Sequence, residues 1–507
     1  MTIGPENLRL VLGLKARARR EARGWTLQEL ARRSGLAISY LSEIEKGKKY
    51  PKPEKLLALA GALELPFEEL VSPRVEEELS PLSAFAASEF LREFPFELFG
   101  LEASDLFDLV SGDPKRSGAL LATFVDVARR HDLEVEQLLF AALRSYQQLH
   151  GNHFPEIESA AERFRAEQGW SEEAALGETE LREVLERRFG YRIDDDELAR
   201  RRSLADLRSV FSAGSPPRLF LNGRLLPSQR AFALAREIGF RVLGLSEHPV
   251  TGNWLKAETF EQVLDNFKAS YFAGALLIPA APMTAALERF FAAPRFRPGD
   301  LAGLPGRFGA TPEMLFYRVS QLAPARFGLS DLFFVRFFRD PERRSPRLTK
   351  VLNLARVAVP YGVSPDEHSC RRWPGVALLG EGAAEPAADA APTASAALCR
   401  FQTEPVEFLV LALARPLALK PRTLSSVSIG LQVDERLRAV ARFLDDPALP
   451  RLEVDLTCER CPLGADACAE RAAPAAVLER QRRLARREAA LAELLGADGA
   501  VPAPTVR

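Results

Sequence analysis

Three cysteines late in the chain have the spacing of a metal or iron–sulfur site. The stretch CERCPLGADACAER places Cys458, Cys461 and Cys468 in a Cys-x2-Cys-x6-Cys pattern. Two thiolates two residues apart can bind one zinc ion or two irons of a cluster, and the third can close the site from the following loop. Zinc would need a fourth ligand, whereas three cysteines with one open corner also suit a [4Fe–4S] cluster. The candidates for a fourth ligand are Cys370, Cys399 and His368. The alternative is three ordinary thiols, since the ligand count is short.

The run FALAREIGFRVLGL (232–245) has the form of a zinc-protease helix without its ligands. Such a helix needs His-Glu-x-x-His, in which both histidines bind zinc and the glutamate is the general base. Here the run reads Arg236-Glu237-Ile238-Gly239-Phe240. Arginine stays protonated and phenylalanine has no lone pair, so neither binds zinc. We expect no zinc and no catalytic residue here. We expect the helix to be core, with four side chains inward: Phe232, Leu234, Ile238 and Val242.

The beginning of the chain has the pattern of a small basic helical domain. Residues 6–70 hold thirteen Lys and Arg against nine Glu, in a chain whose net charge is −1. Apolar residues at helical spacing predict two short helices separated by the turn Ser34-Gly35, with another helix opening at Pro53. Two short helices joined by a glycine-containing turn form a helix-turn-helix. The alternative is a small helical bundle with a solvated basic face.

This stretch resembles the lambda-repressor/Cro-like (XRE) DNA-binding domain. The matching pieces are Leu27-Gln28-Glu29-Leu30-Ala31, Ser34-Gly35, Leu41-Ser42-x-Ile44-Glu45-x-Gly47 and Pro53. The resemblance implies that the helix beginning near Ala37 lies in the major groove of a double-stranded operator. Base edges would be met by Ile38, Ser39, Ser42 and Glu43. Phosphates would be held by Gln28, Tyr40, Lys46, Lys48 and Lys49.

Residues 155–330 resemble the IrrE/ImmA metalloprotease-like domain. The matching pieces are RLFLNG, PSQRAFALAREIGFRVLG and NFKASYFAGALLIP. In the active family a carboxylate ligand precedes the Phe-Ala-x-x-Leu-Leu run, and here that stretch reads Asp265-Asn266-Phe267-Lys268. Because both histidine positions lack a ligand, we expect that the fold is kept without hydrolysis and that the protein is not an enzyme.

The C-terminal third changes to mixed strand and helix. Candidate strands rich in Val, Leu and Ile are LTKVLNLARVAVPYG, EFLVLALARPLAL, SSVSIGLQV and RLEVDLT. The Ala/Pro-rich segment 381–397 between them is expected to be a disordered surface loop. The tail is expected to be one charged helix followed by disorder.

Taken together, these pieces resemble the short-chain fatty acyl-CoA-responsive regulators, which include propionate and glyoxylate-pathway regulators of actinobacteria. The end motif Cys468, Arg471, Ala472 and Pro474 adds to the resemblance. It implies a GAF-like sensory domain, an acyl-CoA effector, an iron–sulfur cluster in some members, and control of carbon or lipid metabolism genes. The gap from Cys461 to Cys468 is wider here, which leaves the type of cluster open.

An acyl-CoA site needs cations for phosphates, an aromatic ring for adenine and an apolar slot for the acyl chain. The basic run RDPERRSPRLTK (339–350) is one source of cations, and Arg371 lies close to Trp373 in the sequence. Tyr271 and Phe272, expected on the helix that faces the vacated zinc site, are candidates for lining a pocket. The alternative is that these residues are solvated charges and core aromatic rings.

The fold class expected is multidomain and mainly α. An all-α helix-turn-helix head (1–72) precedes a helical linker region (73–154) and an α-rich IrrE-like domain (155–330). An α+β GAF-like sensory domain with the cysteines (331–475) and a charged helix with a disordered tail (476–507) follow. At 507 residues the chain is long enough for such a division.

The expected location is the cytoplasm, without membrane contact. No signal peptide is evident, and the longest apolar stretch (271–287) is interrupted by Pro279 and Pro282. We expect a homodimeric transcriptional regulator, because such heads usually bind two half-sites. Two alternatives remain: a DNA-binding redox or iron–sulfur sensor without acyl-CoA response, and a regulatory metalloprotease.

Overall fold

The computed structural model describes residues 5–72, 98, 135–250, 259–341, 345–355, 367–380, 391–404, 406–464 and 466–494. Most of the expected linker region (73–154), residues 381–390 of the expected loop and the end of the tail lie outside this part. The chain divides into two compact units, Met1–Tyr146 with Lys256–Leu264, and Gln147–Leu255 with Asp265–Arg507. The boundary expected at residue 330 therefore lies inside the second unit.

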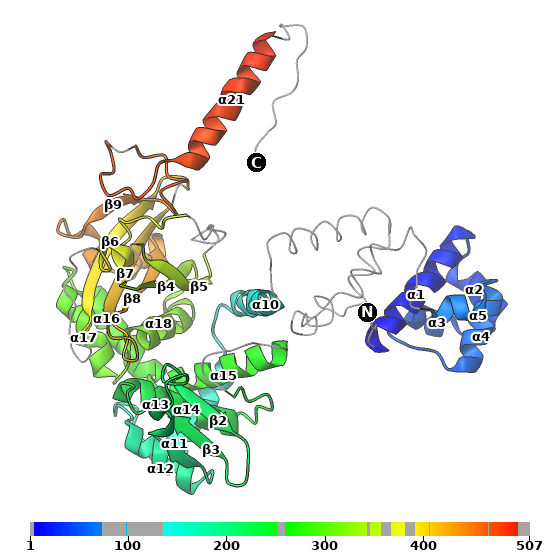
Figure 1. Cartoon of the computed structure of the whole chain (residues 1–507), viewed down its shortest axis with the longest axis horizontal. Helices are drawn as coiled ribbons and strands as arrows, with labels where there is room; N and C mark the ends of the chain where they lie inside the picture. The colour runs from blue at the N-terminus through cyan, green and yellow to red at the C-terminus, as the bar shows by residue number, and fades with distance from the viewer. Residues whose placement is uncertain are drawn as a thin grey trace. The chain divides into compact units, whose positions relative to one another are not determined.

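The described residues 5–72 of the head form a bundle of short helices (Figure 1). They are α1 (Pro5–Ala22), α2 (Leu27–Ser34), α3 (Ile38–Glu45), α4 (Pro53–Ala62) and α5 (Phe67–Val71). Leucines at helical spacing, among them Leu12, Leu30, Leu41 and Leu59, are almost fully buried and form one core. The expected helices and their turn are confirmed.

The second unit begins with helices around a small sheet. Two of the helices, α10 (Val135–Leu149) and α15 (Phe260–Leu277), begin with residues that belong to the head unit. The others are α11 (Pro155–Glu167), α12 (Glu178–Arg187), α13 (Glu197–Arg200), α14 (Pro227–Val242), α16 (Ala280–Ala292), α17 (Pro298–Arg307) and α18 (Pro312–Phe327). The strands are β1 (Arg192–Asp194), β2 (Ser209–Ser212) and β3 (Arg218–Leu221), in the order β1-β3-β2. Strand β1 is parallel and β2 antiparallel to β3.

A buried ion pair connects three of these helices. Arg318 of α18 is fully buried and donates to both carboxylate oxygens of Glu158 on α11, at 2.6 and 2.7 Å. Tyr271 of α15 donates to the same carboxylate at 2.6 Å. Burial alone would raise the pKa of Glu158, but Arg318 outweighs it and the pKa lies below its ordinary value.

A six-stranded sheet follows in the same unit (Figure 1). Its strands are β4 (Leu332–Arg339), β5 (Arg347–Asn353), β6 (Thr393–Phe401), β7 (Glu407–Pro416), β8 (Leu424–Gln432) and β9 (Arg451–Val454), in the order β5-β4-β8-β7-β6-β9. All pairs are antiparallel except β6 with β9. Helices α17, α18 and the short α19 (Pro374–Ala377) pack against the sheet. After β8 come α20 (Glu435–Val440), the 3-10 helix η3 (Arg442–Asp445) and, past β9, α21 (Ala476–Leu494).

The sheet corrects one sequence-based expectation and adds a strand. Residues 393–397, expected to be the end of a disordered loop, belong to β6, which pairs with both β7 and β9. The alanines of this segment pair with β7, and β9 pairs with the second half of β6, from Leu398 to Phe401. The Ala-rich composition resembles that of a disordered segment, but the pairing with β7 makes it a strand. Strand β4 was not expected, yet it lies between β5 and β8. The other expected strands are present as β5, β7, β8 and β9.

No single helix in the described ranges is long and apolar enough to cross a bilayer. The helices α15 and α16 pass such a test only when taken together, and they are bent by 68° at their junction. Both are largely buried within the protein.

Candidate functional site

The head positions α3 through the two ends of α2. Thr26 caps α2 by accepting from the backbone N–H of Glu29, and Gly35 ends it in the left-handed region at φ 68°. Glycine adopts that conformation without steric cost, so the chain turns at once and α3 begins after Ala37. This is the helix-turn-helix geometry that the sequence predicts.

The N-terminal face of α3 is open to solvent. Ile38 is 44% exposed, Ser39 is exposed, and Ser42 and Glu43 are half-buried. Spacings of one and four residues place all four on one face of the helix. The opposite face, formed by Leu41, Ile44 and Glu45, is buried. The candidate base-contacting residues therefore share one accessible surface.

Two features fix α3 against α1. At Gly13 a Cβ atom would lie 2.4 Å from the carbonyl oxygen of Ile44, so only glycine allows this approach. The buried carboxylate of Glu45 accepts from Arg20 Nε and Nη2 at 2.7 and 2.8 Å. Charge-assisted bidentate pairs of this kind set orientation as well as distance.

The candidate phosphate-contacting residues surround this face. Gln28, Lys48 and Lys49 are exposed, whereas Tyr40 and Lys46 are half-buried. Lys49 also forms an ion pair with Glu43 at 3.0 Å.

Lys55, at the start of α4, is a further basic residue near this face that was not predicted from the sequence. Its Nζ lies 4.1 Å from the centroid of the Tyr40 ring, and Lys49 Nζ lies 5.1 Å from it. The exposed Lys55 therefore belongs to the same basic surface. The available signal was the helix start at Pro53, which brings the first turn of α4 toward α3.

In the second unit, α14 carries the residues that stand where the zinc-protease pattern has His-Glu-x-x-His. Arg236, Glu237 and Phe240 are 6%, 0% and 2% exposed. Arg236 reaches Glu237 Oε1 and Asn266 Oδ1 only at 3.5 Å each. The core prediction is confirmed for Leu234 and Ile238, whereas Phe232 and Val242 are half-buried.

A histidine that the sequence analysis did not single out completes this site. His248 Nε2 lies 2.7 Å from Glu237 Oε2, and its ring lies between those of Phe211 and Phe240, with centroids 3.7 and 4.0 Å away. Burial, with the nearby Glu237 carboxylate, raises the pKa of Tyr191 to about 12. Glu237, the carboxylate that the motif would use as general base, is thus paired with His248, whose ring packs against two aromatic side chains.

Close to this site lies a cluster of buried and half-buried charges, which we call the basic cluster: Arg208, Arg236, Glu313, Arg336 and Lys350. Arg336 of β4 donates to both oxygens of Glu313 at 2.9 Å, and Lys350 of β5 lies 3.3 Å from one of them. Burial alone would raise the pKa of Glu313, but the charges of Arg336, Lys350 and Arg208 lower it well below its ordinary value. Glu313 is the main negative charge among these cations.

Two guanidinium groups of the basic cluster are poorly satisfied. Among described residues, Arg208 has no hydrogen bond or ion pair through its side chain, and burial together with the charges of Arg336 and Arg236 lowers its pKa. The Nε of Arg236 is buried with no partner in the described residues. Four cations with the two carboxylates Glu313 and Glu237 leave an excess of positive charge. Such an arrangement favours an anionic ligand.

The cysteines form a third site. Cys370, Cys458, Cys461 and Cys468 are all 4 to 7% exposed. Burial, together with the nearby thiols of Cys458 and Cys461, raises the pKa of Cys370 to about 11. Of the three candidates for a fourth ligand, Cys370 and His368 both lie next to the motif: Cys370 N donates to the carbonyl of Leu456, and Cys458 N donates to the carbonyl of His368. The His368 ring pairs with Glu459, and Cys399 lies on β6.

Arg471, from the end motif, holds the cysteine loops together. Its guanidinium donates to the backbone carbonyls of Cys458, Cys461 and Leu463. As the side chains stand, no three Cys, His, Asp or Glu residues in the described ranges converge as metal ligands. The donor chemistry suits zinc or a cluster, but binding requires the thiols to rotate toward one centre.

The residues expected to line a ligand pocket do not come together. Tyr271 and Phe272 pack against Phe154 and Phe164, whereas Trp373 packs against Phe333 in the core of the large sheet. All three rings are at most 3% exposed. The Tyr271 hydroxyl is bonded to Glu158, and Trp373 Nε1 donates to the carbonyl of Asp455. The rings are core residues, because full burial of an aromatic side chain stabilises the fold more than a solvent-facing position. Arg371 is half-buried and follows Cys370 directly in the chain.

Comparison with known proteins identifies two of these regions. A helix-turn-helix family model matches residues 17–70, and a model of the IrrE N-terminal-like domain matches residues 201–320. The chain carries a helix-turn-helix domain and an IrrE-like domain. Both were expected from the sequence.

The individual relatives match the head. "Transcriptional regulator ClgR" of Mycobacterium tuberculosis (strain ATCC 25618 / H37Rv) is 42% identical over 59 residues, covering 12% of this chain and 53% of that protein. "HTH-type transcriptional repressor RghR" of Bacillus subtilis (strain 168) is 43% identical over 60 residues, covering 12% and 44%. The match thus spans about half the length of each relative. A solved structure titled "Mycobacterium tuberculosis transcriptional regulator" is 21% identical with a TM-score of 0.46, covering 66% of this chain and 94% of that chain.

Proposed function

We propose that this protein is a sequence-specific DNA-binding transcriptional regulator of the XRE type, controlling carbon or fatty-acid metabolism genes. The observation that supports this most is the open N-terminal face of α3, with Ile38 and Ser39 exposed beside Lys48 and Lys49. Side chains on such a face reach base edges, while flanking lysines neutralise phosphates. The relatives that match the head are named as a regulator and a repressor.

The test separates base contacts from phosphate contacts. A duplex selected by the protein from random sequences is titrated with wild type, with Ser39→Ala/Ser42→Ala and with Lys48→Gln/Lys49→Gln. The serine variant should lose discrimination against mismatched duplexes. The lysine variant should weaken all duplexes alike and lower the salt slope by about 2. Unchanged binding in both variants contradicts the proposal.

We further propose that the IrrE-like domain binds a ligand without cleaving one. Its two zinc-ligand positions are Arg236 and Phe240, and Glu237 is engaged by His248. The purified protein should contain no zinc at this position and should show no metal-dependent cleavage. Cleavage that requires zinc and is lost in Glu237→Gln would instead establish the metalloprotease alternative.

For the ligand we propose a short-chain acyl-CoA. CoA is a polyanion with several phosphate groups, and the basic cluster offers Arg236, whose buried Nε has no partner among the described residues, and Arg208, whose side chain has no ion pair there. Phe240 lies one turn from Arg236 on α14 and, like Phe211, packs against the His248 ring. Lys350, from the basic run 339–350, is part of the cluster. Binding there would bias the geometry of the two heads in a homodimer and change operator affinity.

Isothermal titration with acetyl-, propionyl- and longer acyl-CoAs tests this ligand. Arg208→Gln should weaken binding by about 10- to 100-fold, the effect of one charge-assisted hydrogen bond. The matched control is Arg187→Gln, because Arg187 is exposed on α12 and paired with Glu183. Absence of heat with every acyl-CoA, or equal affinity in Arg208→Gln, removes the acyl-CoA proposal.

The second candidate is a redox or iron–sulfur sensor in which acyl-CoA has no part. It rests on the position of Cys370 next to the cysteine motif, where its backbone N–H donates at 3.2 Å to the carbonyl of Leu456, two residues before Cys458. These thiols and Cys468 would hold zinc or a [4Fe–4S] cluster, which would supply redox chemistry or structural cross-linking of the loops. Metal and sulfide analysis should detect one of them, lost in Cys461→Ser and Cys370→Ser but retained in Cys399→Ser. Metal-free protein in every preparation, including anaerobic ones, contradicts this site.

A further inference from the structure

The last described helix, α21, has an unusual concentration of arginine. Its sequence AVLERQRRLARREAALAEL contains Arg480, Arg482, Arg483, Arg486 and Arg487. All five are exposed. The net charge of the whole chain is −1, so this positive charge is local.

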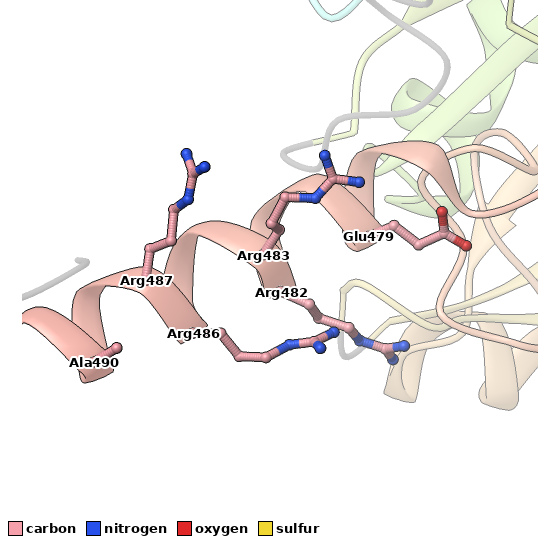
Figure 2. Close-up of a pocket in the computed structure, with 6 residues that line it drawn as sticks. All are labelled: Glu479, Arg482, Arg483, Arg486, Arg487 and Ala490. Carbon is pink, nitrogen blue, oxygen red and sulfur yellow. The ribbon is translucent and has the colours of Figure 1, made fainter.

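Four of these arginines form one surface, which we call the arginine ridge: Arg482, Arg483, Arg486 and Arg487. At 3.6 residues per turn they fall within about 140° of the helix circumference and about 7.5 Å of its length. With Glu479 and Ala490 they line an open hollow of about 560 Å³ (Figure 2). Glu479 is the one acidic residue of this lining.

The ridge lacks internal charge compensation. No ion pair or hydrogen bond within the described ranges involves the side chains of its four arginines. By contrast, Arg182 and Arg187 pair with glutamates four residues earlier in α12. In the ridge, like charges stand at i and i+4, which weakens a helix by about 0.2–0.5 kcal/mol per pair. Binding of a polyanion would relieve this repulsion.

We propose that the arginine ridge binds the phosphate backbone of duplex DNA, as a second, sequence-independent contact beside that of the head. Guanidinium groups match phosphate geometry through paired N–H donors. A duplex carries one charge per about 1.7 Å of axis, so a ridge of this length faces about four phosphates. DNA is favoured over other polyanions because the same chain carries a helix-turn-helix domain, and the inference rests on DNA binding by that head. Once the head is bound, the ridge meets DNA at a high effective concentration.

The experiment measures full-length protein against a duplex of arbitrary sequence and about four helical turns, by fluorescence anisotropy over a range of KCl concentrations. In the variant Arg482→Gln/Arg483→Gln/Arg486→Gln/Arg487→Gln, the slope of log K against log[salt] should fall by about 3 to 4. The same four positions changed to Lys should retain the slope, since the charge is kept. Far-ultraviolet circular dichroism checks that helix content is unchanged.

An unchanged slope in the glutamine variant overturns the inference. So does an unchanged slope accompanied by lost binding to single-stranded RNA or to phosphatidylglycerol vesicles, which would assign the ridge to another partner. The variant Lys48→Gln/Lys49→Gln, with the ridge intact, separates this failure from failure of the head. If that variant binds the duplex as wild type does, the proposed role of the head is wrong, whatever the ridge does.

Discussion

The carboxylate of Glu45 is buried on the inner side of α3, where Arg20 of α1 donates to both of its oxygens. Glu45→Leu would leave the buried guanidinium with only the carbonyl of Trp25 and the side chain of Glu21 as partners. We expect the head to lose about 2–3 kcal/mol of unfolding free energy, since breaking a buried pair costs more than the pair contributes.

Hydrogen exchange of α3 amides in the full chain measures this loss. The double variant Arg20→Met/Glu45→Leu serves as the control, because removing both charges should recover most of the stability. Equal protection in wild type and Glu45→Leu would show that the pair does not orient α3.

Glu158 predicts a pH dependence of the second unit. Its pKa is lower in the folded state than its ordinary value of 4.5, because Arg318 outweighs the effect of burial. The stabilisation is therefore fully present above pH 4.5 and is lost as pH falls through the folded-state pKa. Calorimetry between about pH 6 and 3 should show a steeper fall of the unfolding temperature in wild type than in Glu158→Gln. Parallel curves would contradict the role of this pair.

Individual contact residues were predictable only where a motif contains them. The exposed residues of α3 follow from the helix-turn-helix pattern. His248 and Arg208 do not, because no motif contains them: His248 follows Glu237 by 11 residues, after the end of α14, and Arg208 comes from the segment before β2. For the same reason Tyr271 and Trp373, identified by residue type alone, proved to be core.

At the scale of elements, the approach of α1 to α3 depends on Gly13. In Gly13→Ala the new Cβ would meet the backbone oxygen of Ile44, which cannot move without displacing α3. We expect a loss of about 2 kcal/mol in the head, as for other overpacked sites.

Gly61→Ala is the matched control for this change. Gly61 lies in α4, and its added Cβ would meet nothing within 4 Å. It should stabilise the helix by about 0.5–1 kcal/mol. Thermal unfolding of Gly13→Ala and Gly61→Ala, each compared with wild type, measures both changes in stability. Equal effects of the two alanines would mean that α1 and α3 do not rely on this close approach.

The helices of the head were predictable because each has its own apolar period and its own start and stop residues. The large sheet was less predictable. Strands β5, β7, β8 and β9 are rich in β-branched and leucine side chains, but β6 begins with small residues that mimic a disordered loop. Its place between β7 and β9 depends on pairing with distant segments.

At the scale of the whole molecule, the sequence predicted a helix-turn-helix head and an IrrE-like domain, and both are confirmed by family models over residues 17–70 and 201–320. The boundary expected at residue 330 does not separate compact units, because the large sheet packs on α17 and α18. The residues of the basic cluster come from both regions that this packing brings together. Arg208 and Arg236 belong to the IrrE-like region, and Arg336 and Lys350 belong to the sheet. A ligand at that position therefore touches both parts of the second unit.

The most direct measurement is the affinity of the full-length protein for its selected duplex with and without saturating acyl-CoA at fixed salt. If acyl-CoA binding at the basic cluster changes DNA binding by the head, the dissociation constant of the protein–duplex complex should change by about 5- to 150-fold, the usual range of allosteric coupling. The change should be absent in Arg208→Gln. Identical affinity with and without every acyl-CoA in wild type would contradict the account.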